Sequence, residues 1–346
     1  MKVSLGILAH NEGNVISETI KSLADQDIFF GSLNRLASFQ IVVVPNGCSD
    51  DTAEKARDAL TLAGFPDFVH WKVAELEQAG KTNAWNCFVH EFSEKGVDFF
   101  ILMDGDISFL NRHTLADLIR TLLDNGAAQI SMGHSTKDIS LKKAPTIYER
   151  FLNATSGTYS QDLALAGGMY CIRADAARQV YMPVGISGDD GFLRAMIVTR
   201  YFTEQDDTSL IVKADGAGHI FEAYTSIPAI IRHQKRLVIG TYMNSVIYSY
   251  LWSNSRPGHH AGQIIESLNC ESPDWLPRML SEKVKASGFW VIPMNILFKR
   301  LFNFPRYVTR RQYLKTLILF PAFLVDIYVC LLANSALKRG IGVGYW

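Results

Sequence analysis

The chain has 346 residues, of which 48% are apolar, and its 34 basic and 34 acidic side chains give a formal net charge of zero. This length allows a large core in one domain or two, and the balanced charge excludes a general nucleic-acid binder, which needs a basic surface to displace counterions. The five cysteines include no C-x-x-C pair, and the N-terminus lacks the apolar length of a signal peptide, so we expect a reduced, cytoplasmic protein.

Short apolar runs alternate with helix-like segments through the first third of the chain. The runs are nearly continuous in apolar residues, as in strands that helices cover on both faces. This alternation predicts an α/β fold with a doubly wound, mainly parallel sheet. The expected strands are Val3–Leu8, Ile41–Val44, Phe68–Ala74 and Phe99–Met103, and the expected helices are Asn14–Ala24, Asp50–Leu62 and Lys81–Phe92.

Polar residues follow each of these strands. In a doubly wound sheet, ligands bind at the carboxyl ends of the strands, where loops and helix N-termini converge. We therefore expect the functional site at this rim of the sheet. The residues that follow the four strands, in chain order, are His10-Asn11-Glu12, Pro45-Asn46-Gly47, Glu75 and Asp104-Gly105-Asp106.

Two acidic pairs are candidates for chemistry. Asp104 and Asp106 leave the fourth strand with one glycine between them, and their carboxylates can converge on one hard cation, Mg²⁺ or Mn²⁺, which prefers oxygen ligands and keeps positions open for phosphates. An Asp-Gly turn without a metal is the simpler alternative. Asp189 and Asp190 open a helix expected over Gly191–Val198, where carboxylates can also serve only to cap free N–H groups.

Six stretches stand in a fixed order along the chain: VSLGILAHNEGNVISETIKSL (3–23), IVVVPNGCSDDTAEKA (41–56), AGKTNAWN (79–86), FILMDGDIS (100–108), ALAGGMYCIRADAARQV (164–180) and GISGDDGFLRAMI (185–197). The first four resemble the nucleotide-sugar-binding motifs of glycosyltransferase family 2, whose members have the GT-A fold. The last two resemble the family's acceptor-side strand and acidic catalytic motif. The resemblance covers roughly residues 1–250.

The resemblance implies a role for each acidic pair. Asp104 and Asp106 correspond to the D-x-D motif, which holds a divalent metal, Mg²⁺ or Mn²⁺, across the donor diphosphate. Such a cation stabilises the charge that develops on the leaving group. Asp190 corresponds to the general base, which takes the proton from the acceptor hydroxyl as that oxygen attacks the anomeric carbon. Inversion of configuration follows from this geometry.

The same resemblance places further residues on the donor and acceptor sides. A nucleotide-diphosphate sugar is the implied donor, with a UDP-sugar favoured, although Pro45 stands where the family more often has aspartate. From the residues alone, Asp50 is equally a helix N-cap and Lys81 a solvated surface lysine. The donor side comprises Ala9, Asn11, Glu12, Asn46, Asp50, Lys81, Asp104 and Gly105, and the acceptor and phosphate side comprises Gly167, Gly168, Asp189, His233 and Arg236.

The stretch RHQKRLVIGTYMN (232–244) is similar to the Q-x-x-R-W region of the family. His233 stands for the glutamine, Arg236 takes the arginine place and Leu237 replaces the tryptophan. Because this tryptophan supports the growing polymer in chain-elongating members, its replacement favours transfer of a single sugar. The same residues also form a basic helix turn that could face lipid phosphates.

From about Pro257 the composition changes. A polar, loop-like stretch is expected through Pro277, followed by an apolar segment over Phe289–Asn334. The last part of that segment, Thr316–Asn334, is at the low end of the length that spans a bilayer. It contains Asp326, and an aspartate at the membrane centre costs on the order of 2.5–3.5 kcal/mol.

Six basic residues lie around the junction of the two apolar stretches, interleaved with aromatic residues. Such a cluster suits an anionic membrane surface, to which each basic residue contributes on the order of 1 kcal/mol. We therefore expect residues 1–256 to form the catalytic domain and residues 257–346 a helical region that associates with the inner face of the plasma membrane. The alternative is that these helices pack on the catalytic domain. The six residues are Lys299, Arg300, Arg306, Arg310, Arg311 and Lys315.

The sequence thus predicts an inverting, metal-dependent hexosyl- or N-acetylhexosaminyl-transferase that acts on a glycan or lipid-linked acceptor of the cell envelope. One alternative is a haloacid-dehalogenase-type phosphohydrolase, in which Asp104 is the phosphorylated nucleophile and Lys137 the later lysine. Another is a membrane-associated protein that binds nucleotide sugars without turnover.

Overall fold

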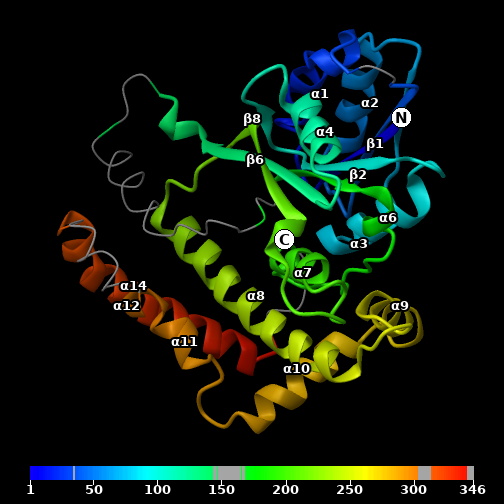
Figure 1. Ribbon diagram of the computed structural model, residues 1–346. Helices are drawn as coiled ribbons and strands as arrows, with labels where there is room; N and C mark the ends of the chain where they lie inside the picture. Colours follow the sequence, from blue (N-terminus) through cyan, green and yellow to red (C-terminus); the bar gives the residue numbers. More distant parts are fainter. Residues whose placement is uncertain (34–35, 143–145, 147–164, 166–167, 303–312, 341–346) are drawn as a thin grey trace.

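The described residues of this computed structural model form one eight-stranded sheet with helices on both faces (Figure 1). The strand order is β3-β2-β1-β4-β7-β6-β8-β5. The structure describes residues 1–33, 36–142, 146, 165, 168–302 and 313–340, with residues 313–318 described by their backbone alone.

The first half of the sheet is parallel. It contains β1 (Lys2–Ala9), β2 (Ser38–Pro45), β3 (Val69–Val73) and β4 (Phe99–Asp104), which pair in the order β3-β2-β1-β4. All four strands predicted from the apolar runs are confirmed. Each is buried on both faces over most of its length except β3, which lies at the edge.

The second half of the sheet is mixed. β7 (Met169–Arg173) lies antiparallel between β4 and β6 (Ile130–Lys137), β8 (Ile211–Phe221) is parallel to β6, and β5 (Ser108–Phe109) is antiparallel to β8. The predicted mainly parallel sheet is therefore confirmed, with an antiparallel part added. The sequence did not indicate β5, β6 or β8, because glycines and polar residues interrupt their apolar pattern.

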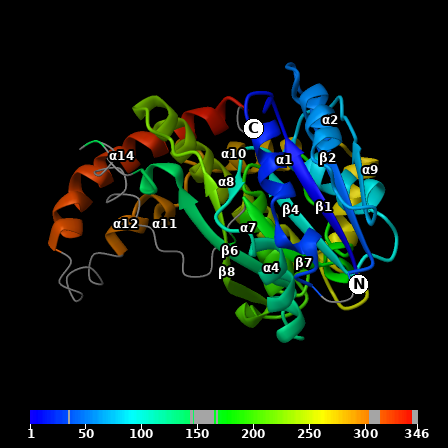
Figure 2. The ribbon, with the colours of Figure 1, turned by 90° about the horizontal axis from the view of Figure 1, so that it is seen from above.

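Helices cover the two faces of the sheet in separate groups (Figures 1 and 2). One face packs against α1 (Ile16–Ala24), α2 (Thr52–Leu62) and α4 (Thr114–Asp124). The other face packs against α3 (Lys81–Cys87, extended by a π-helical turn at Phe88–Phe92), α6 (Ala174–Ala177) and α7 (Asp189–Val198). Short 3₁₀ turns occupy Asp27–Phe30, Asp138–Ser140 and Thr208–Leu210.

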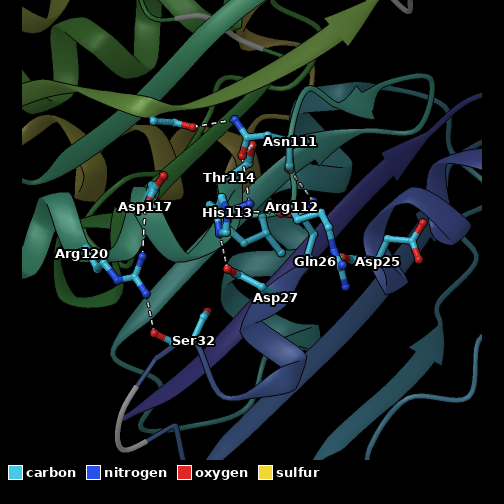
Figure 3. Close-up of polar contacts among 12 residues, drawn as sticks. Asp25, Gln26, Asp27, Ser32, Asn111, Arg112, His113, Thr114, Asp117 and Arg120 are labelled. Atoms are coloured by element: carbon cyan, nitrogen blue, oxygen red, sulfur yellow. Dashed lines mark hydrogen bonds and ion pairs between the residues drawn. The ribbon is translucent and has the colours of Figure 1, made fainter.

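A polar network ties the two halves of the sheet together on the first face (Figure 3). Asp27, after α1, pairs with His113, before α4, and the Nε2 group of Gln26 donates to the carbonyl of Asn111 over 2.9 Å. The Nδ2 group of Asn111 then donates to the carbonyl of Gly216, in β8, over 2.8 Å. These contacts fix α4 and β8 relative to α1.

The stretch expected to be loop-like through Pro277 is mostly helical, so that prediction was wrong. After the long helix α8 (Ile227–Asn254) come α9 (Ala261–Glu271) and α10 (Trp275–Ala286). The His260 side chain starts α9 by accepting the N–H of Gly262 over 3.1 Å. Pro277 lies in the first turn of α10, where its missing N–H has no helical partner to lose.

The chain then forms α11 (Met294–Leu297), α12 (Lys299–Phe302) and α14 (Tyr313–Lys338). α14 lies alongside α8 in both views (Figures 1 and 2). One segment of it, Leu319–Lys338, is long and apolar enough to cross a membrane. The division of the chain at residue 256 remains a prediction. Of the predicted basic cluster, Arg306, Arg310 and Arg311 lie outside the described residues, as does the side chain of Lys315.

Candidate active site

Three charged side chains meet where the carboxyl end of β4 faces the N-terminus of α7. The Nζ atom of Lys81 lies 2.6 Å from Oδ1 of Asp104 and 3.6 Å from Oδ2 of Asp189. All three side chains are largely covered, with exposed fractions of 21%, 26% and 24% in that order. The structure therefore joins the two predicted acidic motifs, and a lysine lies between them.

The electrostatics of this group are dominated by burial and mutual repulsion. Burial raises the pKa of Asp104 to about 6, although the Lys81 ammonium works in the opposite direction. Burial and the neighbouring Asp189 raise the pKa of Asp190 to about 8, while Lys81 and Arg236 oppose that rise. Burial disfavours the charge of Lys81, but Asp104 and the other aspartates outweigh it and raise the lysine pKa. Negative charge is thus in excess at this end of the sheet.

Glu12 extends the acidic group toward the end of β1. Burial raises its pKa to about 7, and the charges of Asp106 and Asp104 add to the effect. Carboxylates that raise one another's pKa are a favourable environment for an added cation. Glu12 therefore extends the negative charge of the D-x-D pair to the end of β1.

The donor set fits a divalent cation shared with a substrate. Among the described residues, no group of three or more His, Cys, Asp or Glu side chains could hold a metal by itself. Mg²⁺ and Mn²⁺ sites that also bind phosphates commonly use one or two carboxylates and complete the shell with water and phosphate oxygens. The half-buried Asp104 and the exposed Asp106 supply that number of carboxylates.

Lys81 is positioned by the loop before α3. Gly80 has φ 141°, a conformation that L side chains rarely adopt, and its N–H donates to Oδ1 of Asn46 over 2.9 Å. The Nδ2 group of Asn46 donates to the carbonyl of Ala9 over 2.7 Å. Both Asn46 and Ala9 are 0% exposed. Asn46 thus links the end of β1 to the loop that carries Lys81, and the donor-side role of Asn46 and Ala9 remains a prediction.

The remaining predicted donor-side residues line the turns around Asp104. Asn11 is exposed, has φ 57°, and accepts the N–H of Ser49 over 2.8 Å. The Asp50 carboxylate accepts the N–H of Gly13 over 3.0 Å and also the Thr52 hydroxyl. Burial opposes its charge, but these hydrogen bonds lower the Asp50 pKa. Asp50 thus shapes the turn before α2 and remains exposed.

A glycine is needed at position 105 because of close packing, not because of an unusual backbone conformation. Its N–H donates to the carbonyl of Leu8 over 2.9 Å, and its carbonyl accepts the hydroxyl of Thr19 over 2.9 Å. A Cβ atom at this position would lie 2.9 Å from Cβ of Ala9. Gly105 therefore lets the turn that carries Asp104 and Asp106 lie directly against β1.

The acidic end of α7 is held by α8, which sequence reasoning did not identify. The Nδ2 group of Asn244 donates to the carbonyl of Gly188 over 2.9 Å, and the Tyr248 hydroxyl donates to the carbonyl of Gly191 over 2.7 Å. A Cβ atom at Gly188 would lie 2.7 Å from Nδ2 of Asn244. Glycines on both sides of the acidic pair were the available signal, since they permit this close approach.

On the acceptor side, Arg236 of α8 lies close enough to Asp190 for its charge to oppose the rise of the Asp190 pKa. His233 stacks on Tyr224 with ring centroids 4.6 Å apart, and burial lowers the His233 pKa to about 4. Gly168 lies against His219, whose Nε2 would be 2.7 Å from a Cβ atom there. Gly167 lies outside the described residues.

Comparison with known proteins agrees with this arrangement. Residues 4–175 match the family model described as Glycosyl transferase family 2. The mannosyltransferase PcManGT from Pyrobaculum calidifontis, solved with GDP-Man and Mn²⁺, superposes with a TM-score of 0.54 at 15% identity, over 96% of this chain and 86% of that chain.

A second solved structure is glucosyl-3-phosphoglycerate synthase from Mycobacterium tuberculosis, in complex with Mn²⁺, UDP-glucose and phosphoglyceric acid. It has a TM-score of 0.47 and 16% identity, over 70% of this chain and 77% of that chain. No curated protein sequence matches the chain. The family match argues against the phosphohydrolase alternative, which left the first three strands unexplained. The chain belongs to glycosyltransferase family 2 and has the GT-A fold.

Proposed function

We propose that this protein is an inverting glycosyltransferase that moves a single sugar from a nucleotide-diphosphate donor to an acceptor hydroxyl. The observation that carries the proposal is the contact of Lys81 with both Asp104 and Asp189, beside Asp190. It brings a metal-binding motif and a candidate base, which are far apart in the sequence, to one end of the sheet.

Asp104 and Asp106 would hold a divalent cation, Mg²⁺ or Mn²⁺, that neutralises the charge developing on the departing diphosphate. Lys81 supplies a fixed positive charge beside the same phosphates. Its ammonium is preorganised by Asp104 and Asp189, so little side-chain reorganisation is needed when the donor binds.

Asp190 is the proposed base. A general base is most effective when its pKa lies near the working pH, and burial together with Asp189 raises the pKa of Asp190 to about 8. Lys81 and Arg236 oppose that rise and favour the ionised carboxylate. Asp190 then takes the proton of the acceptor hydroxyl as the oxygen attacks the anomeric carbon from the side opposite the diphosphate.

The transferred sugar, the donor and the acceptor can also be proposed, more specifically than the reaction class. Leu237, in place of the expected tryptophan, supports transfer of one hexosyl or N-acetylhexosaminyl group rather than polymer elongation. A UDP-sugar is the first donor to test, followed by a GDP-sugar, and a glycan or lipid-linked molecule of the cell envelope is the proposed acceptor. The proposed location of the reaction is the cytoplasm, at the inner face of the plasma membrane.

A thermal-shift screen of nucleotide sugars with and without Mn²⁺ tests the donor part of the proposal, because a ligand that binds only the native state raises its stability. The expected result is stabilisation by one nucleotide class that depends on Mn²⁺. Stabilisation without sugar transfer to any member of a broad acceptor panel would favour a protein that binds nucleotide sugars without turnover.

A further inference from the structure

α14 presents a continuous apolar stripe to solvent. Phe320, Leu324, Tyr328 and Leu331 have exposed fractions of 69%, 53%, 50% and 50%. Their spacing of three or four residues puts them on one face of the helix. Isolated exposed apolar residues are ordinary, but a contiguous stripe of large ones marks an interaction surface.

The opposite face of α14 is held by the rest of the protein. Cys330, Ala333 and Ala336 are buried in the core that also contains residues of α8. Oδ1 of Asn334 accepts the N–H of Val291 over 2.7 Å, so the segment before α11 is tied to the same face. To cross a bilayer, α14 would have to leave this core and expose these residues.

The one acidic residue of α14 is also on the protein side. Asp326 pairs with Arg300, and the two side chains are 19% and 21% exposed. The cost of placing an aspartate in lipid, which argued against a spanning helix, therefore does not apply to the exposed stripe. Its four large side chains carry no formal charge.

Positive charge lies on α14 itself and on α12, which packs against it. Lys299 is exposed in α12, and Lys338 is exposed at the C-terminal end of α14. An anionic lipid surface is complementary to apolar side chains flanked by lysine and arginine. A second copy of this chain would instead bring like charges together.

We propose that α14 is an interfacial anchor: it lies in the plane of an anionic membrane, with the Phe320–Leu331 stripe in the lipid and its other face on α8. This inference rests on the geometry of α14 and is independent of the transfer reaction. α8 also carries Asn244 and Tyr248, which hold the N-terminus of α7. Docking of α14 on the membrane therefore also fixes α8 and the start of α7 relative to the lipid surface.

Co-sedimentation of the full chain with vesicles tests the surface. The variant is Leu324→Glu, and its matched control is Leu123→Glu on α4, because the two leucines are 53% and 52% exposed. We expect wild type and Leu123→Glu to bind phosphatidylcholine vesicles that contain phosphatidylglycerol, and Leu324→Glu to lose about tenfold or more in partitioning. Binding should weaken at high salt and on pure phosphatidylcholine.

Equal binding by Leu324→Glu and Leu123→Glu would overturn the proposal, as would the absence of vesicle binding by the wild type at low salt. Circular dichroism checks folding, and Leu331→Gln replaces Leu324→Glu if the latter unfolds. An alkaline carbonate wash should release the bound wild type; retention in the pellet would indicate a spanning helix. Sedimentation velocity that shows a dimer broken by Leu324→Glu, without vesicle binding, would assign the stripe to a second copy.

Discussion

Nζ of Lys81 and Oδ1 of Asp104 lie 2.6 Å apart, so the first residue of α3 is paired with the last residue of β4. Asp189 lies on the other side of the same ammonium, at 3.6 Å. The lysine therefore partly neutralises carboxylates whose burial otherwise raises their pKa values.

Lys81→Met should leave Asp104 and Asp189 without their cation and lower the free energy of unfolding by about 1–3 kcal/mol, less than for a fully buried pair because these side chains are partly exposed. Mn²⁺ should stabilise this variant more than the wild type, because the added cation relieves the unscreened repulsion. Chemical unfolding at neutral pH, with and without Mn²⁺, measures both effects. Lys81→Arg retains the charge and is the control; an equal Mn²⁺ effect in all three proteins would contradict the prediction.

Asp104→Asn and Asp106→Asn should each weaken Mn²⁺-dependent donor binding, because each removes a charged oxygen ligand. Calorimetry with the nucleotide sugar found in the screen measures the change. Asp58→Asn, on the exposed face of α2, is the control and should bind normally. If both D-x-D variants keep the wild-type affinity and metal dependence, the two aspartates only form a turn.

Asp190→Asn should keep donor affinity and lose turnover by roughly 10²- to 10⁴-fold, since a base acts on the acceptor proton and does not hold the diphosphate. Asp189→Asn should lose less turnover than Asp190→Asn. If both residues only cap α7, either change costs at most about 1 kcal/mol of stability, because asparagine also caps well. Near-normal transfer by Asp190→Asn would remove its role as base.

Asn244→Leu should lower turnover more than donor affinity, because the Gly188 carbonyl keeps only the N–H of Phe192 as its donor and the start of α7 loses this hydrogen bond to α8. The free energy of unfolding should fall by about 0.5–1.5 kcal/mol, as expected for the loss of one hydrogen bond. Asn254→Leu, at the exposed end of the same helix, is the matched control. Equal effects on turnover and affinity would indicate a general loss of stability rather than a positioning role.

His219 should make the protein less stable in mild acid. It is 1% exposed, and burial lowers its pKa to about 4. Between the unfolded value near 6.5 and this folded value, the unfolded chain binds more protons, so stability is present above about pH 6.5 and is lost as the pH falls. At about pH 5 the protein should have lost on the order of 2 kcal/mol of its free energy of unfolding through His219.

Urea unfolding at a series of pH values measures this effect. His219→Gln should flatten the profile between about pH 6.5 and pH 4, whereas His70→Gln, at an exposed position of β3, should leave it unchanged. A profile of the same slope in His219→Gln would assign the acid sensitivity to other groups.

The sequence by itself determined the parallel half of the sheet and the edge at which the predicted site residues gather. The first four strands are apolar throughout, and such runs specify buried strands locally. The polar residues that follow them, including Asp104 and Asp106, must lie at one edge because parallel strands end together. The ordered motifs likewise indicate family 2 from the sequence alone.

Only the tertiary structure decided which of these residues meet and which are buried. Asn46 was expected at the donor, but its amide is fully buried and holds Gly80. Asn244 had no local signal, since its role exists only where α8 crosses the start of α7. The outward stripe of α14 depends in the same way on packing against α8. Local patterns specify helices and strands, whereas contacts between distant segments depend on how those elements pack, which no short stretch of sequence encodes.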